Sequence, residues 1–208
     1  MTPKPKTPRT PPAQLVRVED DVVGCPETLW RVHRGEGPHV LPWNGFRTFG
    51  PLPTMRWDPH PGDEPAPSTE AVLYCAGDIA TCLAEVFQLT RSVDSHSGAP
   101  VLSAWQPLRP LRLLDLTETW PVRNGASATL LTAPRSVCRR WARAIRCMWP
   151  DLDGLRVRST LTGRDAVVLW QPAVDSMPEL PLFSRPLAAP LVWSMARISA
   201  REIGYQML

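Results

Sequence analysis

The chain lacks most of the short motifs by which common enzyme classes are recognised. No GxGxxG and no Walker loop occurs, which argues against a Rossmann or P-loop nucleotide site. No GxSxG marks a serine hydrolase, and no HExxH or closely spaced Cys/His pair marks a metal centre. The four histidines are scattered along the chain, so the sequence predicts no metal site.

Paired cysteines and long apolar runs are also missing. The five cysteines include no CxxC and leave an odd number, and Cys75 and Cys82 fall within apolar patterns. We therefore expect reduced, buried thiols in a cytoplasmic protein. No segment approaches the roughly 20 apolar residues of a membrane span, and the basic N-terminus lacks the apolar region of a secretory signal.

An excess of charge of either sign is absent too. The formal net charge is +3, and much of it comes from Lys4, Lys6 and Arg9 near the N-terminus, so the rest of the chain is close to neutral. Direct binding of nucleic acid is therefore not expected. A hydrophobic content of 43% in 208 residues indicates one soluble domain. Proline and lysine dominate residues 1–20, which predicts a disordered tail before a domain at residues 21–208.

Periodicity predicts more strands than helices. A Gly77-Asp78 turn should begin a helix, with Asp78 as its N-cap, and residues 135–149 form the clearest amphipathic helix. The composition of residues 59–70 indicates a loop. Strands are expected at 28–33, 71–76, 101–106, 111–116, 155–159, 166–170 and 201–208. The strands do not alternate regularly with helices, which favours an α+β fold with central mixed or antiparallel strands and flanking helices.

Several arginines lie off the apolar stripe of the predicted helix at 135–149. A solvated helix face is the simplest interpretation of this pattern. A non-enzymatic module that binds nucleic acid or an acidic protein through this helix remains an alternative.

A loop, a strand and a helix in residues 49–91 carry an arginine, a tyrosine and a glutamate. Arg56 follows a turn-rich stretch, Tyr74 lies near the end of an apolar strand, and Glu85 lies in the following helix. Such side chains could hold an anionic, aromatic substrate and stabilise a developing cation. Helical phase alone makes Glu85 an exposed residue, because the apolar stripe passes through Ile79, Cys82, Leu83, Val86 and Phe87.

Together with two outlying segments, this stretch resembles the RES domain family, named for its Arg, Glu and Ser. The matching segments occur in the family's order: LWRVHR at 29–34, FGPLPTMRWDPHP at 49–61, LYCAGDIATCLAEVFQLTR at 73–91, LRLLDLTETWPVRNGA at 111–126 and DGLRVRSTLTGRDAVVLW at 153–170. One departure is Val157, two residues before the serine, where the subgroup often has an aromatic residue.

The resemblance implies a fold similar to that of ADP-ribosyltransferase toxins and a role as the toxin of a bacterial toxin–antitoxin pair. It implies NAD⁺ as the substrate, destroyed by hydrolysis or by phosphorolysis with inorganic phosphate, and an Xre-type antitoxin that blocks the site. Transfer of ADP-ribose to a protein is an alternative implied by some members. Homo-oligomerisation remains open.

The resemblance also implies five site residues. Glu85, Arg31 and Ser159 take the catalytic positions, and Arg31, Arg56, Tyr74 and Ser159 take the NAD⁺-binding positions. The chemistry suits these residue types, because arginine can grip a pyrophosphate with paired donors and an aromatic ring can stack on the nicotinamide cation. A carboxylate near the anomeric carbon would stabilise the oxocarbenium character that develops as the ribose–nicotinamide bond breaks.

Overall fold

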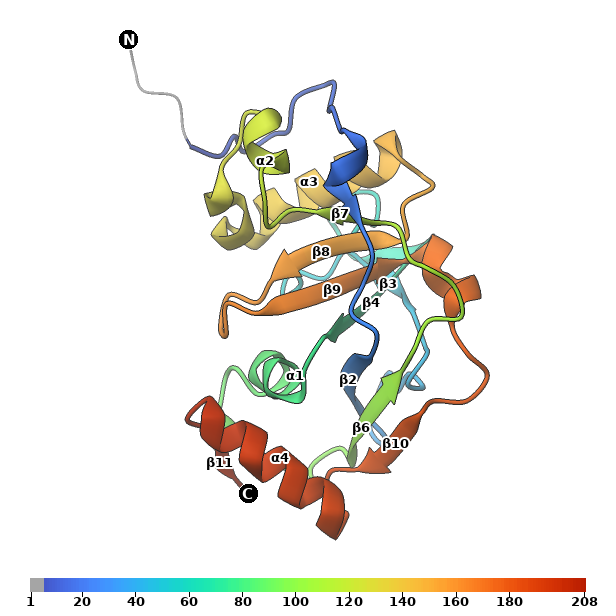
Figure 1. The fold of residues 1–208 in the computed structure, drawn as a ribbon, viewed down its shortest axis with the longest axis vertical. Coiled ribbons are helices and arrows are strands. Elements are labelled where there is room, and N and C mark those ends of the chain that lie inside the picture. Colours follow the sequence, from blue (N-terminus) through green and yellow to red (C-terminus); the bar gives the residue numbers. More distant parts are fainter. Residues whose placement is uncertain (1–5) are drawn as a thin grey trace.

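One mixed sheet with helices on one face organises residues 6–208, the part of the chain that the computed structural model describes (Figure 1). Within that range nine strands form the main sheet in the order β1-β7-β8-β9-β4-β2-β6-β10, with β3 paired to β4. The β7–β8 pair is parallel and its other pairs are antiparallel. The architecture confirms the predicted fold class.

The strands of the main sheet are β1 Val22–Val23, β2 Leu29–Arg34, β3 Arg47–Gly50, β4 Ala66–Ala76, β6 Pro100–Trp105, β7 Leu113–Asp115, β8 Gly154–Arg158, β9 Asp165–Trp170 and β10 Phe183–Pro186. A separate parallel pair joins β5 Ser92–Val93 to β11 Gln206–Met207. The α-helices are α1 Ile79–Val86, α2 Trp120–Arg123, α3 Arg135–Met148 and α4 Pro190–Glu202. Short 3₁₀ helices occupy Glu19–Asp21, Ala128–Thr132 and Gln171–Ser176.

Alternation along the strands gives the sheet two distinct faces. On the face that we call the helical face, Val157 and Val168 pack in one buried cluster with α3, while Val32 and Leu102 pack in another with α1 and α4. Strand register joins the two clusters, because Ala166 is paired with both Val157 and Ala76. The opposite face buries a third cluster that includes Leu29, Leu73, Trp105 and Leu169, with Trp43 and Phe46 packed on it.

Helix α1 begins where the sequence predicts. The Asp78 side chain accepts a hydrogen bond from the Thr81 N–H at 2.8 Å, which confirms the N-cap. The predicted apolar stripe is wrong at its end, because Val86 is 49% exposed. The buried residues run consecutively from Ala80 to Ala84, so the helix is covered on several sides in its middle and is open at its last turn.

Two other predicted elements differ from the structure. Strand β4 begins at Ala66 instead of residue 71, because Gly50 and Phe49 of β3 pair with its first residues. At the C-terminus, residues 201 and 202 end α4, and the predicted final strand is reduced to Gln206–Met207. The buried side of α4 is Val192, Ala196 and Ala200. Small side chains at this spacing give a weak periodic signal, which is why the helix was not predicted.

The described part of the N-terminal segment packs against the rest of the domain. The Arg9 carbonyl accepts from Arg140 Nε at 2.8 Å, and Val16 exchanges hydrogen bonds of 2.8 and 2.9 Å with the Asn124 side chain. Leu15 is buried. Residues 6–20 thus differ from the disordered tail that composition predicts, since their carbonyls and apolar groups find partners on α2 and α3. Residues 1–5 of the predicted tail lie outside the described residues.

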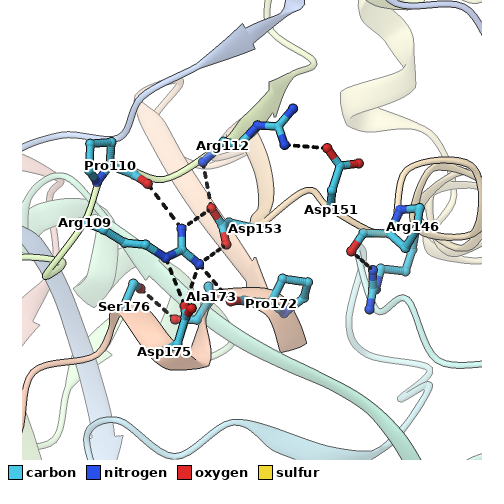
Figure 2. A network of polar contacts seen from close by, with 11 residues as sticks. Arg109, Pro110, Arg112, Arg146, Asp151, Asp153, Pro172, Ala173, Asp175 and Ser176 are labelled. Carbon is cyan, nitrogen blue, oxygen red and sulfur yellow. Dashed lines mark hydrogen bonds and ion pairs between the residues drawn. The ribbon is translucent and has the colours of Figure 1, made fainter.

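An ionic network joins the start of β8 to the chain that flanks β7 and β9 (Figure 2). Arg109 donates two hydrogen bonds of 2.8 Å to the buried Asp153 carboxylate and one of 3.0 Å from Nε to Asp175. Asp153 also accepts from the Arg112 N–H at 2.8 Å. These bonds raise the pKa of Arg109 further above its usual range. The network joins the segment before β7 to the start of β8 and to the 3₁₀ helix after β9.

Candidate active site

A single hydrogen bond joins the two residues that the family motifs mark most clearly. Ser159 Oγ donates to Glu85 Oε1 at 2.7 Å across 74 residues of sequence. Ser159 is buried, while Glu85 is half-buried on α1. The serine oxygen also accepts from the N–H groups of Leu161 and Thr162, both at 3.2 Å. Since those donors point at the oxygen, the hydroxyl proton is directed to the carboxylate.

The turn between β8 and β9 holds α1 at two further points. Thr162 Oγ1 lies 3.0 Å from Thr81 Oγ1, and Arg164 Nη1 lies 3.3 Å from Asp78 Oδ1. Arg164 also pairs with Glu202 of α4. The turn is closed by a 2.8 Å bond from the Ser159 N–H to the Arg164 carbonyl. The helix that carries the glutamate is therefore positioned along its length by one hairpin.

Tyr74 lies on the helical face and is tied through its hydroxyl. Tyr74 Oη donates to Asp58 Oδ1 at 2.8 Å and accepts from the Trp57 N–H at 3.0 Å. Burial, followed by the Asp58 charge, raises the pKa of Tyr74 well above its usual value. The phenol is therefore neutral at physiological pH, and its position depends on the loop at residues 51–58.

Asp58 is a site residue that sequence reasoning missed. It is fully buried and accepts two bonds of 2.7 Å from Arg47 Nη2 and one of 2.8 Å from the Leu52 N–H, besides that from Tyr74. The carboxylate thus joins β3, β4 and the loop that carries Arg56. Its position directly after Arg56-Trp57 was the available signal, but burial of a loop aspartate depends on strand pairing that no local pattern reveals.

Arg56 extends toward α3. Its Nη1 donates to the Ala133 carbonyl and lies 3.5 Å from Cys138 Sγ. The loop behind it is held by Arg139, whose Nη1 donates to the carbonyls of Leu52, Pro53 and Met55 at 3.0 to 3.3 Å. Arg56 is therefore fixed between the loop and the segment that leads into α3.

Arg31 does not join the other four residues. It alternates along β2 with Trp30 and Val32, which pack with α1 and α4, so its side chain lies on the opposite face of the sheet. Its Nη1 donates to the carbonyls of Trp43 and Gly45 at 2.8 and 3.1 Å. Burial lowers the pKa of Arg31 to about 10, which leaves it charged at neutral pH.

Four of the five arginines of α3 bind groups within the molecule. Arg139 and Arg140 donate to main-chain carbonyls, Arg143 bonds Gly62 and Asp63, and Arg146 Nε bonds Glu70 Oε2 at 2.7 Å. The face that the sequence presents as a solvated surface therefore largely binds the loop at residues 52–63, Glu70 of β4 and the N-terminal segment.

Glu85, Ser159, Tyr74 and Arg56 line neither of two cavities. One of about 280 Å³ is lined by Trp30, the start of α1, Arg164 and the end of α4. The other, of about 660 Å³, lies along β10 and the start of α4 and is largely apolar. Within residues 6–208, no group of three or more His, Cys, Asp or Glu side chains could hold a metal ion. No helix of that range is long and apolar enough to cross a membrane.

The family is established by sequence. The model of the RES domain matches residues 28–192, and the chain belongs to the RES domain family. Among solved structures, it is similar to a chain of the crystal structure of the M. tuberculosis MbcT–MbcA toxin–antitoxin complex. The similarity has a TM-score of 0.56 at 19% identity and covers 84% of this chain and 91% of the other. No curated protein matches the chain significantly.

Proposed function

We propose that this RES-domain protein cleaves the nicotinamide–ribose bond of NAD⁺ and acts as the toxin of a toxin–antitoxin pair. The observation that carries the proposal is the 2.7 Å bond from Ser159 to Glu85, which joins the family's serine and glutamate. The MbcT chain, solved as part of a toxin–antitoxin complex, supports the biological role.

In the proposed reaction Glu85 acts mainly in the transition state. Ser159 occupies Oε1 of the carboxylate, which leaves Oε2 for a ribose hydroxyl and directs the negative charge at the anomeric carbon. Positive charge develops on that carbon as nicotinamide departs, so a fixed carboxylate lowers the barrier more than it strengthens substrate binding. Nicotinamide leaves as a neutral base, and the reaction therefore needs no general acid.

The other three predicted residues take distinct roles in this proposal. Arg56 binds the pyrophosphate. The hydrogen bonds found for it within residues 6–208 involve Nη1 alone, so its other N–H groups can donate to phosphate oxygens. Tyr74 offers its ring to the nicotinamide while Asp58 holds its hydroxyl. Arg31 acts from behind the sheet by holding the loop at residues 42–45, instead of touching the substrate.

Nicotinamide release by the purified protein tests the activity. The wild type should consume NAD⁺, and Glu85→Ala should lose at least about 100-fold in kcat, the scale of losing one transition-state electrostatic group. The exposed Glu179 is the matched control, and Glu179→Ala should keep full activity. Full activity in Glu85→Ala would overturn the role of the carboxylate.

Product analysis by mass identifies the acceptor. Free ADP-ribose indicates water, its phosphorylated form in phosphate buffer indicates phosphorolysis, and a labelled protein band from labelled NAD⁺ indicates ADP-ribosyl transfer. We propose water or phosphate as the acceptor.

An Xre-type antitoxin is the proposed partner, and it should cover the face that carries Glu85 and Ser159. Expression of the protein alone should arrest bacterial growth, and co-expression of the antitoxin should restore it. A stable complex that still cleaves NAD⁺ at the rate of the free protein would contradict this mode of inhibition.

A further inference from the structure

Arg135, the first residue of α3, reaches the turn that follows the family's glutamate. Its Nη2 lies 3.5 Å from Gln88 Oε1, and Gln88 Nε2 donates to the Glu85 carbonyl at 2.8 Å. Arg135 is exposed and Gln88 is half-buried. An arginine from a helix 50 residues further along the chain is thus in polar contact with the end of α1.

The same segment carries the anchor of Arg56. That anchor is the carbonyl of Ala133, two residues before Arg135, so the Cα atoms of these two residues are at most about 7 Å apart. Arg135 therefore links the segment that anchors Arg56 to the turn that follows Glu85.

The fold does not account for this arginine. The other four arginines within α3 bond carbonyls or carboxylates, whereas Arg135 contacts a neutral amide at a long distance. No carboxylate of residues 6–208 lies within ion-pairing distance of it. A cation in the first turn is also opposed by the helix dipole. An anion bound beside Arg135 would offset this unfavourable interaction.

We propose that Arg135 binds the pyrophosphate of NAD⁺ together with Arg56 and thereby sets affinity for the intact dinucleotide. The inference rests on the proposed function and deepens it. Two planar guanidinium groups match the two charged phosphates of the linkage. Gln88 holds the Arg135 side chain near the site when no substrate is bound. Arg135 makes no contact with the reacting carbon, so it contributes to binding and not to the chemical step.

Steady-state nicotinamide release by the full chain tests this role. Arg135→Ala should raise KM for NAD⁺ about tenfold, the loss of one charged contact, with kcat within about twofold of the wild type. Nicotinamide riboside contains the same scissile bond and no phosphate, and its kcat/KM should not change. Arg135→Lys keeps the charge but not the planar fork, so its KM for NAD⁺ should lie between those of the wild type and Arg135→Ala.

Arg140→Ala is the matched control on the same helix, because Arg140 bonds the Arg9 carbonyl and should leave both substrates unaffected. Calorimetric titration of NAD⁺ into Glu85→Gln, with and without Arg135→Ala, measures binding without turnover and should show the same loss. An unchanged KM and Kd for NAD⁺ in the Arg135→Ala variants would overturn this inference but not the proposed function. Equal losses of kcat/KM on NAD⁺ and nicotinamide riboside would have the same consequence. A wild type that neither binds nor cleaves NAD⁺ would overturn the proposed function and this inference with it.

Discussion

The bond between Ser159 and Glu85 should be measurable as a coupling free energy in the folded protein, independently of any activity. The variants are Ser159→Ala, Glu85→Ala and the double variant. If the two side chains interact as the structure shows, the double variant is less destabilised than the sum of the single ones. The cycle cancels most effects that each substitution has on its other surroundings.

The contacts in the structure give the expected size of the coupling free energy and of the loss of stability in Ser159→Ala. The hydroxyl-to-carboxylate bond of 2.7 Å is charge-assisted, and because Glu85 is half-buried we take about 1–2 kcal/mol for the coupling. Ser159→Ala also removes an acceptor from the Leu161 and Thr162 N–H groups at 3.2 Å, which water can partly replace near the surface. We therefore expect a total loss of about 2–3 kcal/mol for that variant.

Urea denaturation followed by tryptophan fluorescence gives the four free energies of unfolding at neutral pH. A constant slope with denaturant would show that the substitutions alter stability and not the extent of unfolding. A coupling below about 0.5 kcal/mol, within the error of additivity, would refute the contact as an energetic link. The reasoning about a carboxylate held in one orientation by Ser159 would then fail.

Two further predictions concern the groups behind the site. Arg47→Met should destabilise the protein by about 3–5 kcal/mol, because it leaves the buried Asp58 carboxylate without its bidentate partner, whereas Arg185→Met at an exposed position should change urea stability little. In a Tyr205→Phe variant only Tyr74 can form a phenolate, and its ultraviolet titration should begin well above pH 10. Since the pKa of Tyr74 in the folded protein is raised, its contribution to stability is full below about pH 10 and is lost as pH rises above that value. Titration of Tyr74 at the ordinary tyrosine pKa in the folded protein would contradict the buried contact with Asp58.

Local signals predicted much of the fold. The amphipathic stripe placed a helix at 135–149, and α3 is Arg135–Met148. Alternation at 155–159 predicted β8, and a continuous apolar run at 166–170 predicted β9, each to within one residue at each end. The elements that were missed lack such a signal: α4 buries small side chains, and the start of β4 is a strand because β3 lies beside it. Tertiary pairing overrode the polar, proline-rich composition there.

The candidate residues were predicted from motif order and not from periodicity. Helical phase made Glu85 a surface residue, whereas the structure places it half-buried against Ser159. Arg31 was grouped with the others, yet strand alternation puts it on the opposite face, where loop carbonyls take its donors. Asp58 lies in the matching segment at 49–61 but was assigned no role, and Arg135 lies outside every matching segment, so only their contacts in the structure distinguish them.

By itself the sequence determined the fold class, the positions of the six central strands of the main sheet and of helices α1 and α3, and membership of the RES domain family. These depend on side-chain periodicity, on Gly77-Asp78 as a helix start and on the order of short motifs, all of which are written along the chain. Which side chains meet was decided by tertiary structure alone, because Ser159 reaches Glu85 across 74 residues only after β8 and β9 pair and their turn docks on α1. Register and helix packing set that meeting, and neither is visible in a local pattern.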